Sequence, residues 1–298
     1  MRHNYMIFGY RVSSAFELNA YESDFDHPDV IIEKGQISCF NDAFVKAGYH
    51  YDLEEDLIAF DVPEIGAFEI RNGNTIIVQP VYESNLRELE LFIFGSAFGF
   101  LMHQNKVFPL HGSPVNLGMG CITLVGHSGA GKSSLASAFV ERGYKLLTDD
   151  VSRIECIDSV YYVHPSYPSQ KIWKDDMDRL AINYDPEHRV ISQLDKYYIK
   201  SRDRFCDVRQ PLIAVIEIVP SEVRSPTLVQ MHQSDVLNAF LTHSYRQEVM
   251  GGKTDLGAHL RFCSSLSKSI SFFRILRPLE GFTVREQVDA ILTQFMNT

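Results

Sequence analysis

The chain is poor in cysteine, and no two of its cysteines form a C-x-x-C pair. An odd number of cysteines without close spacing argues against a disulfide framework and against a zinc site. Unpaired thiols of this kind are typical of a reducing compartment, so we expect a cytoplasmic protein. The five cysteines are Cys39, Cys121, Cys156, Cys206 and Cys263.

Long apolar runs are also absent. The most apolar stretch is LFIFGSAFGFLM, residues 91–102, which is too short to span a bilayer and predicts a buried helix instead. The first residues, MRHNYMIFGYRVSS, contain Arg2 and His3 but neither an apolar core nor a small-residue cleavage site, so we expect no signal peptide. These two observations predict a protein without a membrane partner.

Positive charge is in short supply. The 298 residues include 28 Lys and Arg against 38 Asp and Glu, which gives a formal net charge of −10. Sequence-independent binding of nucleic acid depends on many Lys and Arg contacts with phosphates, so we expect no nucleic-acid partner. The remaining composition, 45% hydrophobic and 22% charged, is that of a globular protein, and the length allows one large domain or two ordinary ones.

The N-terminal part of the chain reads as β-rich. The stretches DVIIEKGQIS and FEIRNGNTIIVQP each place two β-prone runs around a glycine turn, and Asn72-Gly73 is a strong hairpin signal. Residues 83–106 then read as one helix, with Ser84 or Asn85 as its N-cap.

Strands and helices alternate from residue 109 onward, so we predict a β-rich domain over 1–108 and a second domain over 109–298. CITLV is a continuous apolar run, as expected of a strand buried on both faces, and the helix that follows the next glycines is expected to stop at Gly143. The second domain is therefore α/β with a central sheet. Its other expected elements are a hairpin over 151–165, a buried strand over 212–219, and helices over 234–245 (capped by Ser234), 255–268 and 282–297.

A phosphate-binding loop is predicted at GHSGAGKS, residues 126–133, which matches G-x-x-x-x-G-K-[ST] between a strand and a helix. Glycines let backbone N–H groups approach a phosphate, and the helix N-terminus adds a favourable dipole. Lys132 is expected to act catalytically on the β- and γ-phosphates, and the Ser133 hydroxyl to bind Mg²⁺. The alternative is a glycine-rich turn that serves packing alone. His127 and Ser128 occupy variable positions, so their side chains receive no role. The predicted nucleotide-binding residues are Gly126, Ser128, Gly129, Ala130, Gly131, Lys132, Ser133 and Ser134.

Two adjacent carboxylates, Asp149 and Asp150, follow Lys132 by only 17 residues, at the end of a short predicted strand, KLLTDD. Two carboxylates beside a triphosphate repel it unless a cation or a proton intervenes, which favours one metal ligand and one proton acceptor. A phosphoryl-transfer enzyme needs both groups. The alternative is a polar strand end whose acids are solvated or cap the backbone. His111, in FPLHGSPV, precedes Lys132 by 21 residues, and a lone histidine is more often structural.

Together, LHGSPV, GHSGAGKSS and RGYKLLTDD resemble the catalytic domain of the HPr kinase/phosphorylase family. That family has a histidine, the loop and an Asp-Asp pair in this order and at this spacing, on a P-loop kinase domain related to the phosphoenolpyruvate carboxykinase fold. By this resemblance His111 would support Asp149, and Asp149 would be the catalytic base on the acceptor hydroxyl. Asp150 would help to hold Mg²⁺ with Ser133. The resemblance extends over the second domain, and its first third carries the specific motifs.

Two departures refine this resemblance. HPr kinases carry a glycine-rich signature after the Asp-Asp pair, tied to the reverse phosphorylase reaction, but the matching stretch here is VHPSYPSQKIWKDDMD. GAFEIRNGNTIIV and LELFIFGSAFGFLMHQ differ from the HPr kinase N-terminal domain and resemble the HPr-kinase-like proteins encoded with lasso peptides. Those enzymes phosphorylate the C-terminal Ser of the precursor peptide. The resemblance therefore implies a kinase with ATP and Mg²⁺ as cofactors and a precursor peptide as partner, and it leaves a homo-oligomer open.

Rival functions require motifs that the chain lacks or leave its features unexplained. A GTPase switch needs a D-x-x-G element, which does not occur, and GKTD at 252–255 is only a loose match to the guanine-reading motif. A transport ATPase carries an L-S-G-G-Q segment, which is also missing. Two alternatives stay open. One is an HPr-type serine kinase that acts on a protein, and the other is a nucleotide-sensing module without transfer activity, which would need no base.

Several further residues are candidates for the edge of the site. Lys171 and Lys196 could bring a second basic group to the phosphates, although solvated surface lysines are the simpler expectation. The acidic cluster in WKDDMDR is expected at an exposed helix start. Tyr245 and Arg246 are candidates that the sequence does not position.

Overall fold

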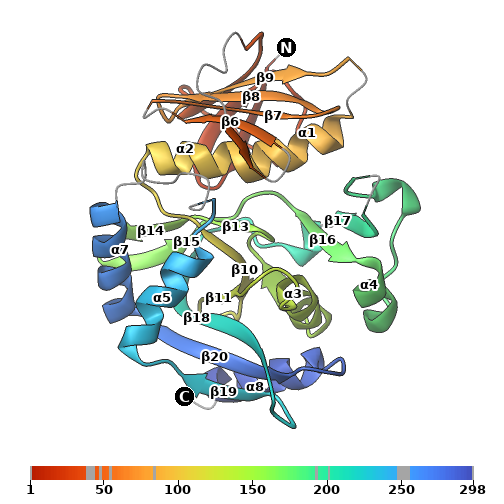
Figure 1. Ribbon diagram of the computed structural model, residues 1–298, viewed down its shortest axis with the longest axis vertical. Helices are drawn as coiled ribbons and strands as arrows, with labels where there is room; N and C mark the ends of the chain where they lie inside the picture. Colours follow the sequence, from red (N-terminus) through yellow and green to blue (C-terminus); the bar gives the residue numbers. More distant parts are fainter. Residues whose placement is uncertain are drawn as a thin grey trace. The chain divides into compact units, whose positions relative to one another are not determined.

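The chain is described by a computed structural model, whose elements are drawn in Figure 1. Its contacts divide the protein into two units, Met1–Pro109 with Tyr245–His259, and Leu110–Ser244 with Leu260–Thr298. The break after Pro109 falls one residue beyond the boundary expected from the sequence, whereas the grouping of 245–259 with the first unit has no counterpart in that expectation. The described residues are 2–37, 44–46, 49–53, 56–82, 85–191, 194–200, 202–246 and 256–296.

The first unit is built on a mixed sheet with the strand order β3-β1-β2-β4-β9-β8-β7-β6-β5. β4 pairs in parallel with β2 and with β9, and the other neighbours are antiparallel. Side chains alternate between the faces of a strand, and Phe68, Ile70, Ile76 and Val78 are fully buried on this pattern. The β-rich character expected of this segment is confirmed. The strands are β1 (His3–Ile7), β2 (Tyr10–Ser14), β3 (Tyr21–Glu22), β4 (Val30–Lys34), β5 (Phe44–Lys46), β6 (Tyr49–Leu53), β7 (Leu57–Val62), β8 (Gly66–Arg71) and β9 (Thr75–Pro80).

The hairpin expected around Asn72-Gly73 is formed by β8 and β9. Both turn residues are left-handed, with φ of 51° at Asn72 and 64° at Gly73, as the two central residues of a type I′ turn require, and Arg71 pairs with Thr75 across the turn. The stretch DVIIEKGQIS was expected to supply a second pair of strands, and only its first run forms one, β4. Gln36 and Ile37 lie outside any strand, and Ser38 lies outside the described residues.

The helical segment expected after this sheet forms, but not as one regular helix. α1 (Leu86–Phe92) and α2 (Phe98–Gln104) are joined by a π-helical turn, Ile93–Ala97. Asn85 caps α1 by accepting a hydrogen bond from a first-turn backbone N–H at 3.0 Å, whereas Ser84, the other expected cap, lies outside the described residues. The π-helical turn is wholly buried, as expected of this apolar run. Within the described part of the chain, no helix has both the length and the hydropathy to cross a membrane.

The second unit contains a sheet with the strand order β12-β10-β11-β18-β15-β14, which β13 extends at β10 and β20 extends at β18. β11 pairs in parallel with β18, and β18 with β20, whereas β10 is antiparallel to β11. β16 and β17 form a separate ribbon, and the mixed α/β class expected for this part is confirmed. The strands are β10 (Leu110–Asn116), β11 (Cys121–Val125), β12 (Lys145–Leu146), β13 (Val151–Ser152), β14 (Ile154–Ile157), β15 (Val160–Val163), β16 (Ser169–Trp173), β17 (Lys196–Lys200), β18 (Gln210–Ser221), β19 (Thr227–Gln230) and β20 (Ser271–Pro278).

The helices of this part follow the sequence pattern closely. α3 ends two residues before Gly143, as expected, and β14 with β15 forms the expected hairpin. The cap expected at Ser234 is wrong, because α5 begins after His232, which makes no side-chain capping bond. The first residues of α7 group with the first unit. The helices are α3 (Lys132–Glu141), α4 (Lys174–Leu180), α5 (Gln233–His243), α7 (Leu256–Ser269) and α8 (Val284–Met296), with short 3₁₀ turns at Pro186–His188 and Arg202–Arg204.

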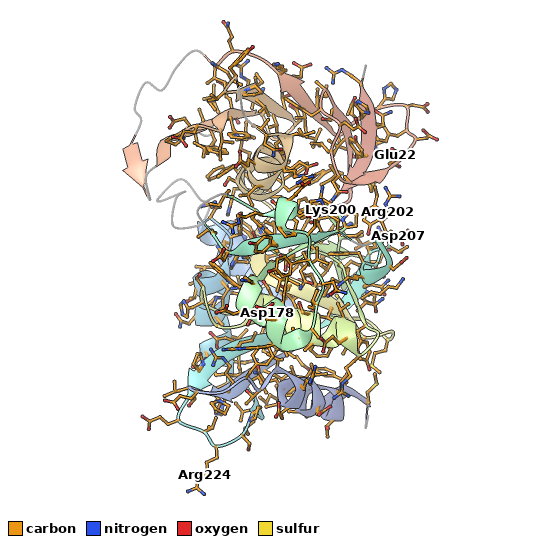
Figure 2. All side chains as sticks on the ribbon, turned by 90° about the vertical axis from the view of Figure 1, so that its right-hand side faces the viewer. Glu22, Asp178, Lys200, Arg202, Asp207 and Arg224 are labelled. Carbon is orange, nitrogen blue, oxygen red and sulfur yellow. The ribbon has the colours of Figure 1, made fainter. Side chains whose placement is uncertain are left out.

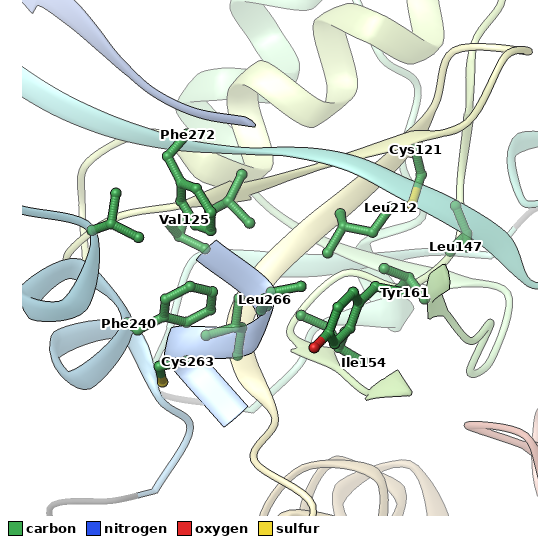
Figure 3. Packing of buried hydrophobic residues seen from close by; sticks show 14 residues of the cluster. Cys121, Val125, Leu147, Ile154, Tyr161, Leu212, Phe240, Cys263, Leu266 and Phe272 are labelled. Carbon is green, nitrogen blue, oxygen red and sulfur yellow. The ribbon is translucent and has the colours of Figure 1, made fainter. Parts of the chain in front are cut away.

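Side chains from the sheet and from α5 and α7 meet in one apolar cluster of the second unit (Figure 3). Val125 and Leu212 come from adjacent strands, Phe240 and Leu266 come from the helices, and each contributes roughly 1.5–3 kcal/mol by leaving water. Burial in this cluster raises the pKa of the Cys263 thiol to about 12. Because Val125 is the last residue of β11, the cluster fixes the strand end from which the glycine-rich loop departs. Cys121, Cys156, Cys206 and Cys263 are free thiols, and Cys39 lies outside the described residues.

Candidate active site

The glycine-rich loop connects β11 to α3, so the strand–loop–helix context predicted from the motif is present. Gly131, the N-cap of α3, has a φ of 105°, a left-handed value that strongly favours glycine. It supplies no side-chain capping bond, so the first backbone N–H groups of α3 are open to an anion. Gly126 lies buried where β11 ends. The loop residues that line the adjoining cavity are Ser128, Gly129, Ala130, Gly131, Lys132, Ser133 and Ser134.

Lys132 lies over the loop from the first turn of α3. Its Nζ donates hydrogen bonds to the backbone oxygens of Gly126, at 2.6 Å, and His127, at 3.3 Å. Burial lowers the pKa of this ammonium, although Asp150 and Asp149 act in the opposite direction. An anion bound at the loop would replace the carbonyl oxygens as the partner of the ammonium and would favour its charged form.

Three neighbouring side chains hold the loop and the start of α3 in place. Ser134 Oγ donates to Asp176 Oδ2 at 2.6 Å, and Gln170 Nε2 donates to the Ser133 backbone oxygen at 3.1 Å. Arg277 Nε donates to the Ala130 backbone oxygen at 3.0 Å. The loop is thus tied to α4, β16 and β20.

The acidic cluster at the start of α4 behaves only in part as expected. Asp175 and Asp178 are exposed, and Figure 2 labels Asp178 on the face where α4 turns toward the viewer. Asp176 differs, because it is half-buried, bonds to Ser134 and lines the cavity. The expectation of an exposed helix start is therefore wrong for this one acid.

Asp149 and Asp150 lie between β12 and β13, not at the end of a strand, because β12 stops at Leu146. Asp149 is only 4% exposed and lines the cavity. Its Oδ2 accepts a hydrogen bond from the Lys171 backbone N–H at 2.8 Å, while its buried Oδ1 has no hydrogen-bond partner among the described residues. Burial raises the pKa of this carboxyl.

Asp150 has two cationic or potentially cationic neighbours. Its Oδ2 lies 2.5 Å from Lys171 Nζ, and its Oδ1 lies 3.2 Å from His111 Nδ1. Burial alone would raise the pKa of Asp150, but Lys171 and His111 outweigh it and hold this pKa well below its usual range. The structure pairs His111 with Asp150, and the support of Asp149 by His111 that the resemblance implies stays a prediction.

Lys171 and Lys196 come from facing strands of the β16–β17 ribbon. Lys171 is 4% exposed and Lys196 lines the cavity, so the expectation of solvated surface lysines is wrong. Burial opposes the charge of Lys171, but Asp150 raises its pKa well above the ordinary value; burial and Lys171 lower the pKa of Lys196. The cavity is lined by four basic side chains and three carboxylates, which leaves a small excess of positive charge for an anionic ligand; they are Lys132, Lys196, Arg179 and Arg277 against Asp149, Asp150 and Asp176.

The cavity that these groups share has a volume of about 560 Å³ and continues beyond the loop to the β20–α8 connection. No sequence motif marks the end of the cavity at the β20–α8 connection. The aromatic and apolar residues there follow no spacing that would have predicted a binding site. Tyr245 and Arg246 belong to the first unit, where Tyr245 packs against Gly99 and Arg246 donates to Ser96 Oγ at 2.8 Å. The lining residues that the sequence did not suggest are Trp173, Arg179, Arg277, Leu279, Gly281, Phe282, Thr283, Val284 and Gln287.

A metal ion at this site would depend on a bound ligand. Across the described residues, no group of three or more His, Cys, Asp or Glu side chains is arranged to hold a metal by itself. The Ser133 hydroxyl and the Asp150 carboxylate are hard oxygen donors on the same cavity, and Mg²⁺ in nucleotide sites is typically bound by one or two such groups and by phosphates.

Comparison with known proteins gives no family. No family model matches the chain, and no curated protein matches it. Among solved structures, the chain is similar to the Hpr(Ser) kinase/phosphatase from Coxiella burnetii, with 13% identity over 63% of this chain and 90% of that chain. The TM-score of this similarity is 0.34.

Proposed function

We propose that the protein is an ATP- and Mg²⁺-dependent kinase that phosphorylates a serine hydroxyl, that of the C-terminal Ser of a lasso peptide precursor. The observation that carries the proposal is the buried Oδ1 of Asp149, which has no hydrogen-bond partner among the described residues and belongs to the cavity that Lys132 and the glycine-rich loop also line. A module that only senses a nucleotide has no use for a proton acceptor there. The residue motifs that resemble the HPr-kinase-like proteins of lasso peptide clusters support the choice of acceptor.

The nucleotide is ATP, and its phosphates lie on the loop. The open N–H groups of α3 and the ammonium of Lys132 are the phosphate ligands in this proposal, and Lys196 adds a second cation on the same cavity. A volume of about 560 Å³ is within the range of small-molecule sites. Backbone dipoles and buried cations fixed in advance stabilise the charge that develops during phosphoryl transfer.

The residues fit a magnesium ion on the phosphates. The Asp150 carboxylate stays ionised because its pKa is held low, and the Ser133 hydroxyl belongs to a residue that lines the same cavity. These two groups would hold the ion, which would supply charge neutralisation on the phosphates. Asp150 would then share its charge among the ion, Lys171 and His111.

Asp149 is the proton acceptor in the transfer step. As the serine oxygen forms its bond to the γ-phosphorus, the bond from that phosphorus to the β–γ bridging oxygen breaks and ADP leaves. The proton of the serine hydroxyl passes to Oδ1 of Asp149. A carboxyl whose pKa burial has raised is a better base near neutral pH than an ordinary one. The backbone N–H of Lys171 holds its other oxygen and so orients the group.

Mass spectrometry of a candidate acceptor tests the proposal. The full-length protein is incubated with ATP, Mg²⁺ and a precursor peptide that ends in Ser. We expect a gain of one phosphate on that Ser, and none on a peptide that ends in Ala. Lys132→Ala should abolish the transfer, because it removes a phosphate ligand, whereas Lys174→Ala changes an exposed lysine of α4 and should leave it intact.

Other outcomes would assign the protein to one of the alternatives. Phosphorylation of the carrier protein HPr with the peptide untouched would identify a serine kinase that acts on a protein. Tight nucleotide binding without transfer to either acceptor would identify a sensing module. Rapid release of phosphate without any acceptor would identify an ATPase.

A further inference from the structure

The part of the cavity beyond the loop is formed by the β20–α8 connection and the first turn of α8. In the sheet order, β10, β12 and β13 lie on one side of β11, and β18 and β20 lie on the other. Figure 1 shows β10 and β20 on opposite sides of β11. The carboxylate pair follows β12, and it lines the same cavity as the residues after β20. If the terminal phosphate lies toward Asp149 and Asp150, as the proposed function requires, the base of the nucleotide lies toward α8.

Gln287, in the first turn of α8, is a buried polar residue on this part of the cavity. Its side chain lines the cavity but is only 2% exposed. Nε2 donates to Thr283 Oγ1 at 3.2 Å, one turn earlier on the same helix, while Oε1 is buried without a hydrogen-bond partner among the described residues. A buried amide oxygen without a donor is costly, and such groups in native proteins are usually met by a ligand, a water or a neighbouring side chain.

We infer that Gln287 reads the base of the nucleotide and selects adenine. Its unmet Oε1 accepts a hydrogen bond from the exocyclic amino group of adenine, and the second hydrogen of Nε2 reaches the adjacent ring nitrogen. This is the bidentate pairing by which side-chain amides recognise adenine. Thr283 orients the amide with its nitrogen toward the hydroxyl. Guanine presents a carbonyl oxygen where adenine presents the amino group. That oxygen would face Oε1, and two acceptors repel each other and form no hydrogen bond.

Apolar surface for a planar base is available at the same end. Leu279 and Phe282 line this part of the cavity. The guanidinium carbon of Arg179 lies 5.2 Å from the centre of the Phe282 ring, which connects α4 with the β20–α8 connection at the cavity wall. Aromatic and apolar side chains of this kind pack on any base, so selection between bases falls to Gln287, whose amide oxygen has no donor within the described ranges.

Equilibrium binding to the full-length protein tests this inference with four probes: ATP, GTP, purine riboside triphosphate, which lacks the amino group, and inorganic tripolyphosphate. The wild type should bind ATP roughly tenfold or more tightly than GTP or the purine analogue. Gln287→Leu and Gln287→Met should weaken ATP binding to the level of the purine analogue and leave tripolyphosphate binding unchanged. Gln294→Leu, an exposed glutamine of the same helix, should change none of these affinities.

The controls separate this inference from the proposed function on which it rests. Binding of tripolyphosphate together with equal affinity for ATP and the purine analogue would overturn the role of Gln287 and leave the phosphate site standing. A preference for GTP would also overturn it. Failure to bind tripolyphosphate and every nucleotide would overturn both proposals. The unliganded Gln287→Met variant should melt no lower than the wild type, because the amide oxygen is unmet there; a large loss of Tm would identify a structural role instead.

Discussion

Two carboxylates that are neighbours in the sequence have opposite pKa shifts in this protein. Burial raises the pKa of Asp149, whereas Asp150, despite its burial, has its pKa lowered by Lys171 and His111. Pairs of acids with divergent pKa values divide the work of a site, because one can take up a proton while the other stays charged. The division arises because burial dominates at Asp149, whereas the Lys171 ammonium and His111 outweigh burial at Asp150.

This division predicts different phenotypes for the two acids. Asp149→Asn should lower kcat by about 10²–10⁴, the usual worth of a positioned base, with little change in nucleotide affinity. Asp150→Asn should weaken the apparent affinity for Mg²⁺, because it removes the ionised oxygen ligand. Kinetic titrations with metal and nucleotide measure both effects. Equal shifts in apparent Mg²⁺ affinity for the two variants would show that both acids serve the metal.

At this scale the sequence predicted the loop but not its surroundings. The fixed positions of the motif, from Gly126 to Ser133, depend on local backbone chemistry, and their strand–helix context is present as predicted. The burial of Lys171 was missed because it depends on the pairing of β16 with β17 and on Asp150, which no local pattern encodes. The ion pair of His111 with Asp150 was not predicted for the same reason, since adjacent acids differ only in where their side chains go.

At the scale of elements, the end of α2 is hydrogen-bonded to the hairpin of β8 and β9. We call these bonds of Gln104 and Asn105 the hairpin clamp. The backbone N–H of Gly73 donates to Gln104 Oε1 at 2.9 Å, and Asn105 Nδ2 donates to the Gly73 backbone oxygen at 2.7 Å. Gln104 Nε2 also donates to the Ile70 backbone oxygen at 3.3 Å. Helix and hairpin in the first unit therefore stabilise each other through polar bonds at a single turn.

Substitution of the turn glycine should loosen this unit locally. In Gly73→Ala, the alanine must hold a φ of 64°, which strains the backbone. Its Cβ would also collide with Asn105 Oδ1, which disturbs the hairpin clamp. The left-handed conformation alone costs roughly 1–2 kcal/mol. Hydrogen exchange by mass spectrometry should show faster exchange in β8 and β9. Gly118→Ala, at a φ of 92° with no atom within 4 Å of its Cβ, carries only the backbone cost and should leave these strands unchanged. Unaltered hydrogen exchange in β8 and β9 of Gly73→Ala would show that the hairpin clamp does not stabilise these strands.

The sequence predicted elements best where their pattern was long or their turn chemistry specific. The hairpin at Asn72-Gly73 and the buried β11 are examples, since a positive φ or a fully apolar run leaves little choice. The π-helical turn within 93–97 and the strand β20 were missed. A π turn keeps the apolar composition of a regular helix, and a short apolar run such as SFFRIL becomes a strand through its pairing with the distant β18.

At the scale of the whole molecule, buried histidines predict a loss of stability in mild acid. Burial lowers the pKa of His164 and of His259 to about 4, from an ordinary 6.5. The unfolded chain therefore binds protons more readily, so these groups favour the folded state above about pH 6.5 and lose that contribution as the pH falls toward 4. Glu217, whose pKa is lowered by its hydrogen bonds with His243 and Arg274, acts in the same direction at lower pH.

Thermal unfolding between pH 7.5 and pH 4.5 measures this effect, and the Tm should fall steadily below pH 6.5. The Tm of His259→Phe, which retains a ring to stack on Phe108, should fall less than the wild-type Tm over the same pH range. His27→Phe changes an exposed histidine of the same unit and should keep the wild-type slope. A Tm that is independent of pH across this range would contradict the assignment of neutral buried histidines.

The hydrogen bond between Arg277 and Ala130 can form only late in synthesis on the ribosome. The two residues are 147 positions apart, and β18, which supports β11, must itself pair with β20. At about 5–20 residues per second, roughly 7–30 s pass between translation of the loop and translation of the arginine that holds it. A nascent chain thus carries the complete glycine-rich motif long before it has the strand β20 and Arg277 that hold the loop. In the proposed function, nucleotide binding would therefore begin only after Arg277 has been made.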